Sequence, residues 1–412
     1  MVNKSAIGNQ LRVVTEYIPS NTVSVGVWVD AGSRDESPVL NGTAHFVEHM
    51  LFKGTATRDA NEIAKELDSL GGMSNAFTSK ETTCLYGTVL GSQVDQFVAV
   101  LSDLFLRSLF SAAEFEREKL VVLQEISMVD DTPEDQIHDL LASTVWSGHS
   151  LANPVLGTAQ TVSAITAEDL SAFVKQFYTT DRIVIAAAGN VQHQDFAAIV
   201  SREFEHCLRP EENAPRYCRK IPTRCAPGSV VWRKSLEQAH VLFSVYCPPI
   251  NDPARYELAL LNILLGGNMS SRLFQELREE KGLAYSIYSY VDSMTDAGTL
   301  SIYAGVAPKN IEESSAMIYE TVSGLQENIT RDELVRAQNY ARAAMYLASE
   351  SMEARMTRLA KNEMYFDRHY TLEEVDKALA KVRLEDLLVV ANRIFEKPMT
   401  SVVLGPVASN QA

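Results

Sequence analysis

The chain has 412 residues, 46% of them hydrophobic and 22% charged, a composition typical of a folded globular protein and not of a disordered or low-complexity chain. This length exceeds what one hydrophobic core usually serves, so two or more domains are expected. The 37 basic and 53 acidic residues give a formal charge of −16, which argues against nucleic acid as a partner because a polyphosphate backbone would be repelled.

The cysteines and the N-terminal segment indicate a cellular compartment. The five cysteines form an odd set without a Cys-x-x-Cys pair, so neither a disulfide framework nor a thiolate metal site is indicated. Residues 1–8 lack an apolar signal core, and no run approaches 18 apolar residues. We therefore expect a cytoplasmic protein with reduced thiols and no membrane association.

Hydrophobic periodicity in the first half of the chain predicts a mixture of strands and helices. Val23, Val25, Val27 and Val29 alternate with Ser24, Gly26 and Trp28, a period of two that is typical of a strand. Apolar residues at helical spacing follow, and Gly54 stands where the first helix should end. The expected strands are 23–29, 82–90 and 182–188, and the expected helices are 43–53, 59–70, 93–105 and a long one from 111 that ends before Pro133.

The order of elements then begins again after a stretch that contains Pro210, Pro215, Pro222 and Pro227. A strand at 240–246 and helices at 256–265 and 271–280 repeat the pattern that begins at residue 23. The prediction is an α+β fold of two similar halves related by internal duplication. The boundaries are 1–208 for the first half, 209–228 for a linker and 229–412 for the second half.

The segment His45-Phe46-Val47-Glu48-His49 carries the clearest chemical signal. At roughly 100° per residue, the two histidines and the glutamate point to one face of a helix. Both imidazoles can then bind one Zn²⁺ at about 2.0–2.1 Å, while the carboxylate reaches a water molecule. On the residues alone, surface histidines beside a glutamate are the alternative. At an offset near 211 the second half has Tyr256, Ala259 and Leu260 at the matching positions, so it is expected to lack the metal.

A catalytic zinc usually has three protein ligands, so a third ligand must come from elsewhere in the fold. Glu125, which lies on the predicted long helix, is the best candidate. Glu118 lies seven residues earlier, about two turns, on the same face, and is expected to orient a ligand histidine from behind.

The chain resembles the pitrilysin or insulinase family of inverted-motif zinc peptidases. The resemblance is carried by this motif and by three further stretches, 71–78, 264–273 and 277–285. The similarity covers nearly the whole chain and is closest to the short-chain branch that contains mitochondrial processing peptidase and its bacterial relatives. In that family the third ligand lies 76 residues beyond the second histidine, and 49 + 76 gives Glu125.

The resemblance also implies roles for other residues. Asn75 and Ala76 match the edge-strand motif that holds the substrate backbone as an added strand. Phe52 matches the aromatic wall for the side chain after the scissile bond, although alone it would be interpreted as a core residue. Arg278 and Tyr285 match an arginine/tyrosine pair that can donate to the carbonyl oxygen as it gains charge.

The same resemblance suggests a substrate. Asp135 and Asp139 match acidic positions that meet an arginine upstream of the cut in the processing peptidases, and a solvated charged helix face is an equal alternative. The resemblance therefore implies a zinc endopeptidase with one Zn²⁺ per chain that acts on peptides or unfolded, presequence-like segments, with some preference for basic ones. Water would be activated by the zinc and by Glu48 as general base.

Members of this branch pair their subunits, so the expected partner is a second copy of the chain, with a heterodimer as the alternative. Two other functions remain open on the sequence. One is a non-catalytic assembly subunit of the same fold, which the intact metal set argues against. The other is a metal-binding or storage protein, a function that does not explain the region of Arg278 and Tyr285.

Overall fold

The computed structural model describes residues 2–8, 10–207, 209, 218–223 and 227–407. Within these residues the chain forms two compact units, each assembled from three segments. Unit 1 comprises Met1–Ser127, Asn153–Arg219 and Leu347–His369, and unit 2 comprises Met128–Ala152, Lys220–Tyr346 and Tyr370–Ala412.

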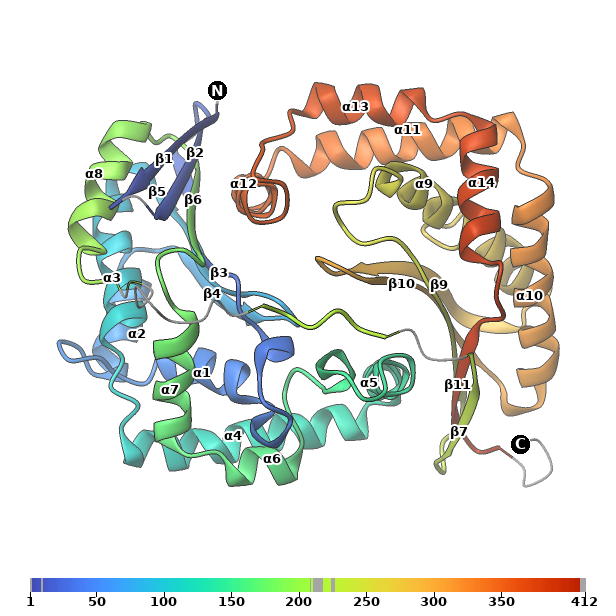
Figure 1. Cartoon of the computed structure of the whole chain (residues 1–412), viewed down its shortest axis with the longest axis horizontal. Helices are drawn as coiled ribbons and strands as arrows, with labels where there is room; N and C mark the ends of the chain where they lie inside the picture. The colour runs from blue at the N-terminus through green and yellow to red at the C-terminus, as the bar shows by residue number, and fades with distance from the viewer. Residues whose placement is uncertain (1, 9, 208, 210–217, 224–226, 408–412) are drawn as a thin grey trace. The chain divides into compact units, whose positions relative to one another are not determined.

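Unit 1 is built on a six-stranded sheet in the order β1-β2-β6-β3-β5-β4 (Figure 1). Its strands are β1 (Val2–Ile7), β2 (Leu11–Tyr17), β3 (Thr22–Val29), β4 (Met73–Thr78), β5 (Thr83–Leu90) and β6 (Ile183–Gly189). The pair β2 and β6 is parallel, and the other neighbours are antiparallel. Among the described residues β4 comes last in this order, so it is an edge strand of the sheet.

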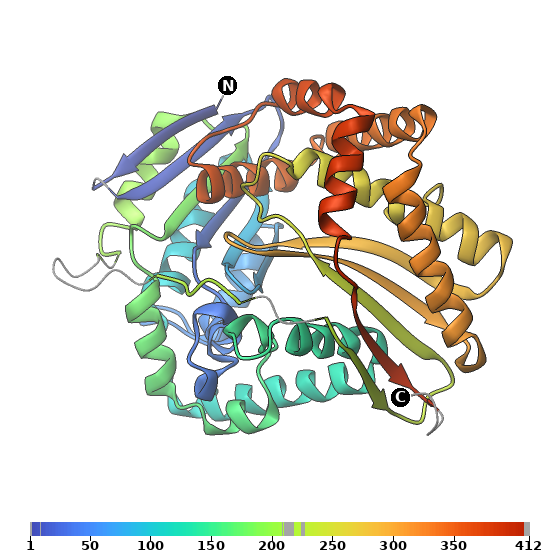
Figure 2. The ribbon, with the colours of Figure 1, turned by 45° about the vertical axis from the view of Figure 1, so that its right-hand side comes forward.

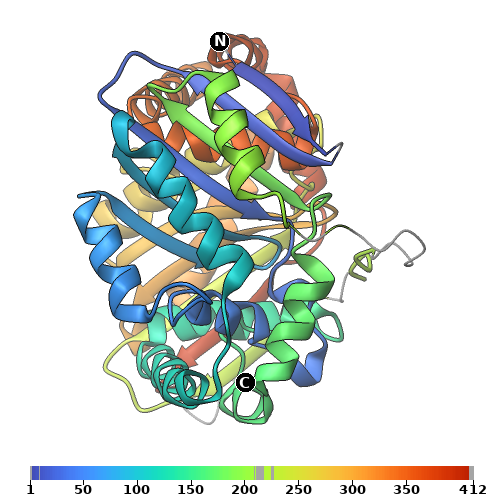
Figure 3. The same cartoon turned by 90° about the vertical axis from the view of Figure 1, so that its left-hand side faces the viewer.

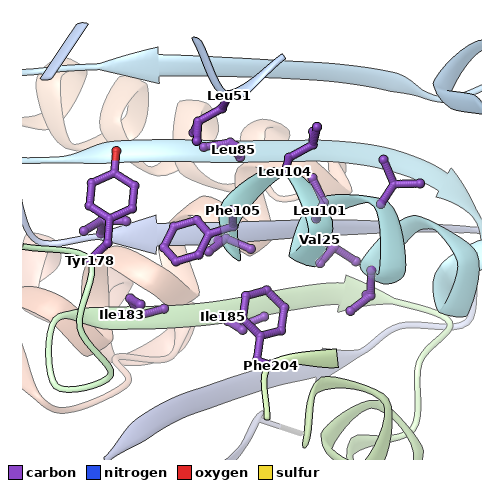
Figure 4. Close-up of a cluster of buried hydrophobic side chains, with 14 of the residues drawn as sticks. Val25, Leu51, Leu85, Leu101, Leu104, Phe105, Tyr178, Ile183, Ile185 and Phe204 are labelled. Carbon is purple, nitrogen blue, oxygen red and sulfur yellow. The ribbon is translucent and has the colours of Figure 1, made fainter. Parts of the chain in front are cut away.

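Helices cover both faces of this sheet. On one face lie α1 (Thr43–Leu51), α3 (Val94–Arg107), α7 (Ala167–Phe177) and α8 (His193–Glu203), and Figure 3 looks onto α8 and α3 in front of the strands. Their side chains meet those of β3, β5 and β6 in one large apolar cluster, part of which is drawn in Figure 4. Such burial is the main source of folding free energy. It also fixes α1 against the sheet.

The other face of the sheet is covered by α12 (Met352–Phe366), which comes from far along the chain. Trp28 and Met356 are both almost fully buried there, and the Trp28 Nε1–H donates to the Met356 sulfur at 3.2 Å. Unit 1 is formed mainly by the first half of the sequence, and a helix from the second half completes it.

Unit 2 contains a five-stranded sheet in the order β7-β11-β8-β10-β9 (Figure 2). Its strands are β7 (Ser229–Arg233), β8 (Ala239–Tyr246), β9 (Ala284–Ser293), β10 (Gly298–Val306) and β11 (Thr400–Gly405). One face packs against α9 (Arg255–Leu265), α10 (Ile311–Glu327) and α14 (Leu384–Ile394). The other packs against α5 (Pro133–Val145), which comes from the first half of the sequence. Apart from short 3-10 helices, the other helices of the described residues are α2 (Ala60–Ser69), α4 (Ala112–Asp131), α6 (Ala159–Ala164), α11 (Arg331–Ala348), α13 (Leu372–Lys381) and the π-helix η5 (Phe274–Glu280).

The two sheets have the same topology once β1 is set aside. In both, a parallel outer pair is followed by three antiparallel partners, so β7, β11, β8, β10 and β9 correspond to β2, β6, β3, β5 and β4. Gly71 and Gly282, which the sequence sets in parallel, both have φ +61°. The predicted α+β fold of two similar halves is confirmed, with the difference that each sheet contains one parallel pair.

The predicted strands and helices of the first half agree with the structure to within about two residues at each end. The helix expected at 271–280 is shorter and is a π-helix that begins at Phe274. Strands β1, β2, β7, β9, β10 and β11 were not predicted. Pro210 and Pro215 of the predicted linker lie outside the described residues, so its boundaries stay a prediction.

Two further expectations concern cysteines and membranes. Of the described cysteines, Cys84, Cys207, Cys218 and Cys247 form no disulfide bond, and Cys225 lies outside the described residues. None of the helices in the described part of the chain combines the length and the apolar character needed to cross a membrane.

The packing of α12 in unit 1 generates a first prediction. Met356→Ala removes a fully buried side chain and should lower the free energy of unfolding by about 2–5 kcal/mol, measured by urea denaturation. Met269 is 73% exposed, so Met269→Ala should change the free energy of unfolding by no more than about 0.5 kcal/mol. Equal effects of the two substitutions would contradict the packing of α12 on the sheet.

Candidate metal centre

Helix α1 presents its polar side chains opposite its apolar ones. Phe46, Val47, Met50 and Leu51 are buried in the core of unit 1. Because their positions fix the rotation of the helix, His45, Glu48 and His49 lie together on the remaining face. These three side chains are only partly buried, so they remain open to a ligand.

Helix α4 brings a carboxylate to this face. Glu125 Oε2 lies 3.7 Å from His45 Nε2 and 3.3 Å from His49 Nε2. In the part of the chain that the structure describes, His45, His49 and Glu125 form one group whose ligand atoms all lie within 4.8 Å of one another. Two imidazole nitrogens and one carboxylate oxygen are a donor set that suits a catalytic zinc, with a position left for water. The residues present therefore fit the metal that the sequence predicts.

Electrostatics keep His45 ready to bind a cation. Burial, with a smaller contribution from the nearby His49, lowers the pKa of His45 to about 4. The imidazole is therefore neutral near pH 7, and a neutral ring is the form that coordinates a metal ion.

Glu48 lies beside the three ligands but is not one of them. Its Oε2 accepts a hydrogen bond of 2.5 Å from Thr78 Oγ1 on β4. Burial raises the pKa of Glu48, whereas this hydrogen bond and His49 lower it and Glu125 raises it further. A partly desolvated carboxylate held in one orientation suits proton transfer.

Glu118 connects the metal ligands to a lysine that the sequence analysis missed. One carboxylate oxygen lies 2.9 Å from His49 Nδ1, and the other lies 2.7 Å from Lys53 Nζ. Contact with Nδ1 leaves Nε2 of His49 directed at Glu125, which is the usual way an outer carboxylate orients a ligand histidine. Lys53 follows His49 by four residues, so helical spacing could have indicated it.

The predicted substrate-binding residues of unit 1 lie on β4 and directly after α1. Asn75 and Ala76 belong to β4, the unpaired edge of the sheet, and the Asn75 side chain is exposed. Asn75 Oδ1 accepts a hydrogen bond from the Ala76 N–H at 2.8 Å. Phe52 follows α1 directly and packs partly buried against the core, so its role in binding stays a prediction.

The arginine and the tyrosine predicted to act together are in contact within unit 2. Arg278 lies on the π-helix η5, with its guanidinium 5.6 Å from the centre of the Tyr285 ring. The pairing of β9 with β10 skips Tyr285 at a bulge, because Ser286 faces Gly305 and Ala284 faces Val306. Tyr285 is 79% exposed. Bulges and π-helices often re-aim functional side chains.

Asp135 and Asp139 also belong to unit 2, on α5, and Asp135 is exposed. The three candidate metal ligands belong to unit 1. The participation of Arg278, Tyr285, Asp135 and Asp139 in one site with the metal therefore stays a prediction.

Comparison with known proteins places the chain in a family. Residues 12–159 match the family described as Insulinase (Peptidase family M16), and residues 164–340 match the Peptidase M16 inactive domain. An uncharacterized zinc protease of Bacillus subtilis is 38% identical over 98% of this chain and 98% of its own length. The chain belongs to the M16 peptidase family. An uncharacterized zinc protease of Mycobacterium leprae is also 38% identical, over 100% of this chain and 93% of its own length.

Solved structures of other proteins share this fold. A protease from Helicobacter pylori has a TM-score of 0.93 at 24% identity, and the alignment covers 98% of this chain and 99% of that chain. A peptidase M16 inactive domain from Pseudomonas fluorescens has a TM-score of 0.91 at 20% identity, with 99% of this chain and 98% of that chain aligned. The candidate metal ligands all fall in the segment that matches the first M16 domain.

The convergence of α1 and α4 gives a second prediction. Glu125→Gln should weaken zinc binding by more than about 100-fold, because a direct ligand matters more than the outer partners, whose loss costs 10–100-fold. Isothermal titration of the metal-free protein would measure this. Glu116→Gln is the matched control, since Glu116 lies on the same helix with its side chain 71% exposed. Similar zinc affinities in the two variants would contradict the assignment of Glu125.

Proposed function

We propose that this M16 protein is a zinc-dependent endopeptidase that hydrolyses peptides or unfolded segments. The observation that carries the proposal is the group formed by His45, His49 and Glu125, with Glu48 beside it and not in it. The names of the relatives, which are zinc proteases, support the same metal and the same class of reaction.

His45, His49 and Glu125 would hold the metal. When bound, zinc supplies Lewis acidity, which makes water more acidic and polarises a carbonyl group. Glu48 would accept a proton from the attacking water and return it to the leaving amine. The pKa of Glu48 is raised, which brings it closer to the pH range in which one group can both accept and donate a proton. Thr78 would keep the carboxylate in place through its hydrogen bond.

The open edge of β4 offers a way to hold the substrate. An extended peptide can add to an unpaired strand through main-chain hydrogen bonds, which makes few demands on its sequence. Strand β4 carries Thr78, the partner of Glu48, so a peptide on this edge would run past the general base. This arrangement favours an endopeptidase that acts on unfolded segments.

Arg278 and Tyr285 would donate to the carbonyl oxygen as it gains negative charge and to the neighbouring peptide backbone. Asp135 and Asp139, together with the formal charge of −16, favour basic peptides. The predicted cytoplasmic location stays a prediction.

The role of Glu48 gives a third prediction. Glu48→Gln should keep one zinc ion per chain but lower kcat by about 10²–10⁴-fold on peptides that the purified protein cuts, since amide nitrogen cannot take the proton. A chelator should abolish the activity of the unsubstituted protein, and Glu116→Gln should retain it. Near-normal activity of Glu48→Gln would rule out the general base. Zinc binding without any hydrolysis would favour the non-catalytic assembly subunit.

The predicted pairing of two identical chains gives a fourth prediction. A Glu48→Gln chain mixed with a Tyr285→Phe chain should recover part of the lost activity if Tyr285 acts on the metal site of the partner subunit. A mixture of Glu48→Gln and Glu125→Gln should recover none, because each metal site then carries a defect. Mixed dimers that form but show no recovery in the first mixture would argue against a shared site.

A further inference from the structure

The first turn of α1 lacks a cap of the ordinary kind. Its N-cap is Gly42, which has no side chain and adopts φ +100°. A Cβ at this position would meet the Leu156 carbonyl oxygen at 2.7 Å, so Ser, Thr, Asp and Asn, the usual caps, do not fit. The unpaired N–H groups that begin every helix must therefore be satisfied by another residue.

Glu36 fills this role from outside the helix. Its Oε1 accepts a hydrogen bond from the Ala44 N–H at 2.6 Å, and its Oε2 accepts one from the Gly42 N–H at 2.8 Å. The Asn41 side chain donates to Oε2 at 2.8 Å and also to the Pro154 carbonyl oxygen at 2.9 Å. Three donors thus hold one carboxylate, which is only 7% exposed.

Stability alone does not explain a carboxylate at this place. Burial raises the pKa of Glu36 to about 8, although the hydrogen bonds from Ala44, Asn41 and Gly42 oppose the shift. A raised pKa means that the ionised group is less favourable in the folded protein than in the unfolded chain. A buried group that disfavours folding is a candidate for a functional role.

The equivalent helix of the second half begins differently. Helix α9 is preceded by Asp252, whose Oδ1 accepts a hydrogen bond from the Ala254 N–H at 2.8 Å. Asp252 is not buried, and it lies in the sequence two residues before the group that it caps. Helix α9 also has no metal ligands at the matching positions. Helix α1, which carries the candidate metal ligands, therefore has a buried cap, and helix α9 does not.

We infer that Glu36 is a positioning residue for the metal centre, which fixes the first turn of α1 so that His45 meets His49 and Glu125. The inference rests on the proposed zinc site. His45 is the third residue of α1 and directly follows Ala44, whose N–H binds Glu36.

The loop that carries Glu36 is itself held in place. Arg219 donates to both oxygens of Asp35 at 2.8 Å. The Ser33 and Arg34 N–H groups donate to the carbonyl oxygens of Ser79 and Lys80 at 3.1 and 2.8 Å. Glu36 therefore acts from a fixed base, as a positioning residue must.

Glu36→Gln tests the inference, because it keeps the size of the side chain but replaces one acceptor oxygen by a donor that faces N–H groups. The zinc dissociation constant, measured by chelator competition, should rise about 10–100-fold. The visible absorption of the Co²⁺-substituted protein should change, since it reports the geometry of the ligands. Asp59→Asn is the control, because Asp59 also accepts a hydrogen bond from the first turn of a helix, α2, and α2 carries no ligand.

The outcomes separate this inference from the proposed function. A wild-type chain that binds no zinc contradicts the zinc site itself. Normal zinc binding by the wild type together with an unchanged dissociation constant and an unchanged Co²⁺ spectrum in folded Glu36→Gln contradicts the role of Glu36 alone. If Glu36→Gln does not fold, Asn41→Ala removes one of the three donors, and zinc binding as tight as in the wild type would then overturn the inference.

Discussion

The contact between α1 and α4 is the constraint on which the candidate site depends. Two imidazoles and a carboxylate must approach within 4.8 Å before any ion compensates for their loss of water. The Phe46 ring of α1 and the Phe115 ring of α4 stack with centroids 4.7 Å apart, in the core below the polar face. Glu118 of α4 also contacts both His49 and Lys53. An apolar and a polar contact thus align the same two helices.

Duplication explains why only one half of the chain needs these polar contacts. Both halves supply a strand followed by a helix on the sheet, but α9 carries Tyr256, Ala259 and Leu260 where α1 carries His45, Glu48 and His49. Leu260 is fully buried, so the second helix serves packing at that position. The second half, which lacks the metal ligands, contains two irregular features. These are the π-helix that carries Arg278 and the bulge at Tyr285. Each of these costs regular hydrogen bonding, which is why such features tend to mark function.

Local spacing made part of the site predictable from the sequence. His45, Glu48 and His49 lie within one and a half turns, so their common face follows from helix geometry alone. Glu125 was selected by the spacing known from a family, because periodicity does not show which helix packs on which. Glu36 was missed altogether, since a carboxylate that caps a helix from outside leaves no capping pattern within the helix. The same limit applies to α12, whose amphipathic pattern predicts a buried face but not the sheet that buries it.

The exchange of α5 and α12 between the halves shows that the units of sequence and the units of folding differ. Unit 1 carries the candidate metal ligands, yet one face of its sheet is covered by 347–369, far beyond the predicted linker at 209–228. Without that segment, Trp28 and Val184, now at 1% and 0% exposure, would face water. The chain passes from one unit to the other at Ser127, Ala152, Arg219, Tyr346 and His369. Unit 1, which holds the candidate metal ligands, is thus complete only when residues 347–369 from the second half of the sequence cover its sheet.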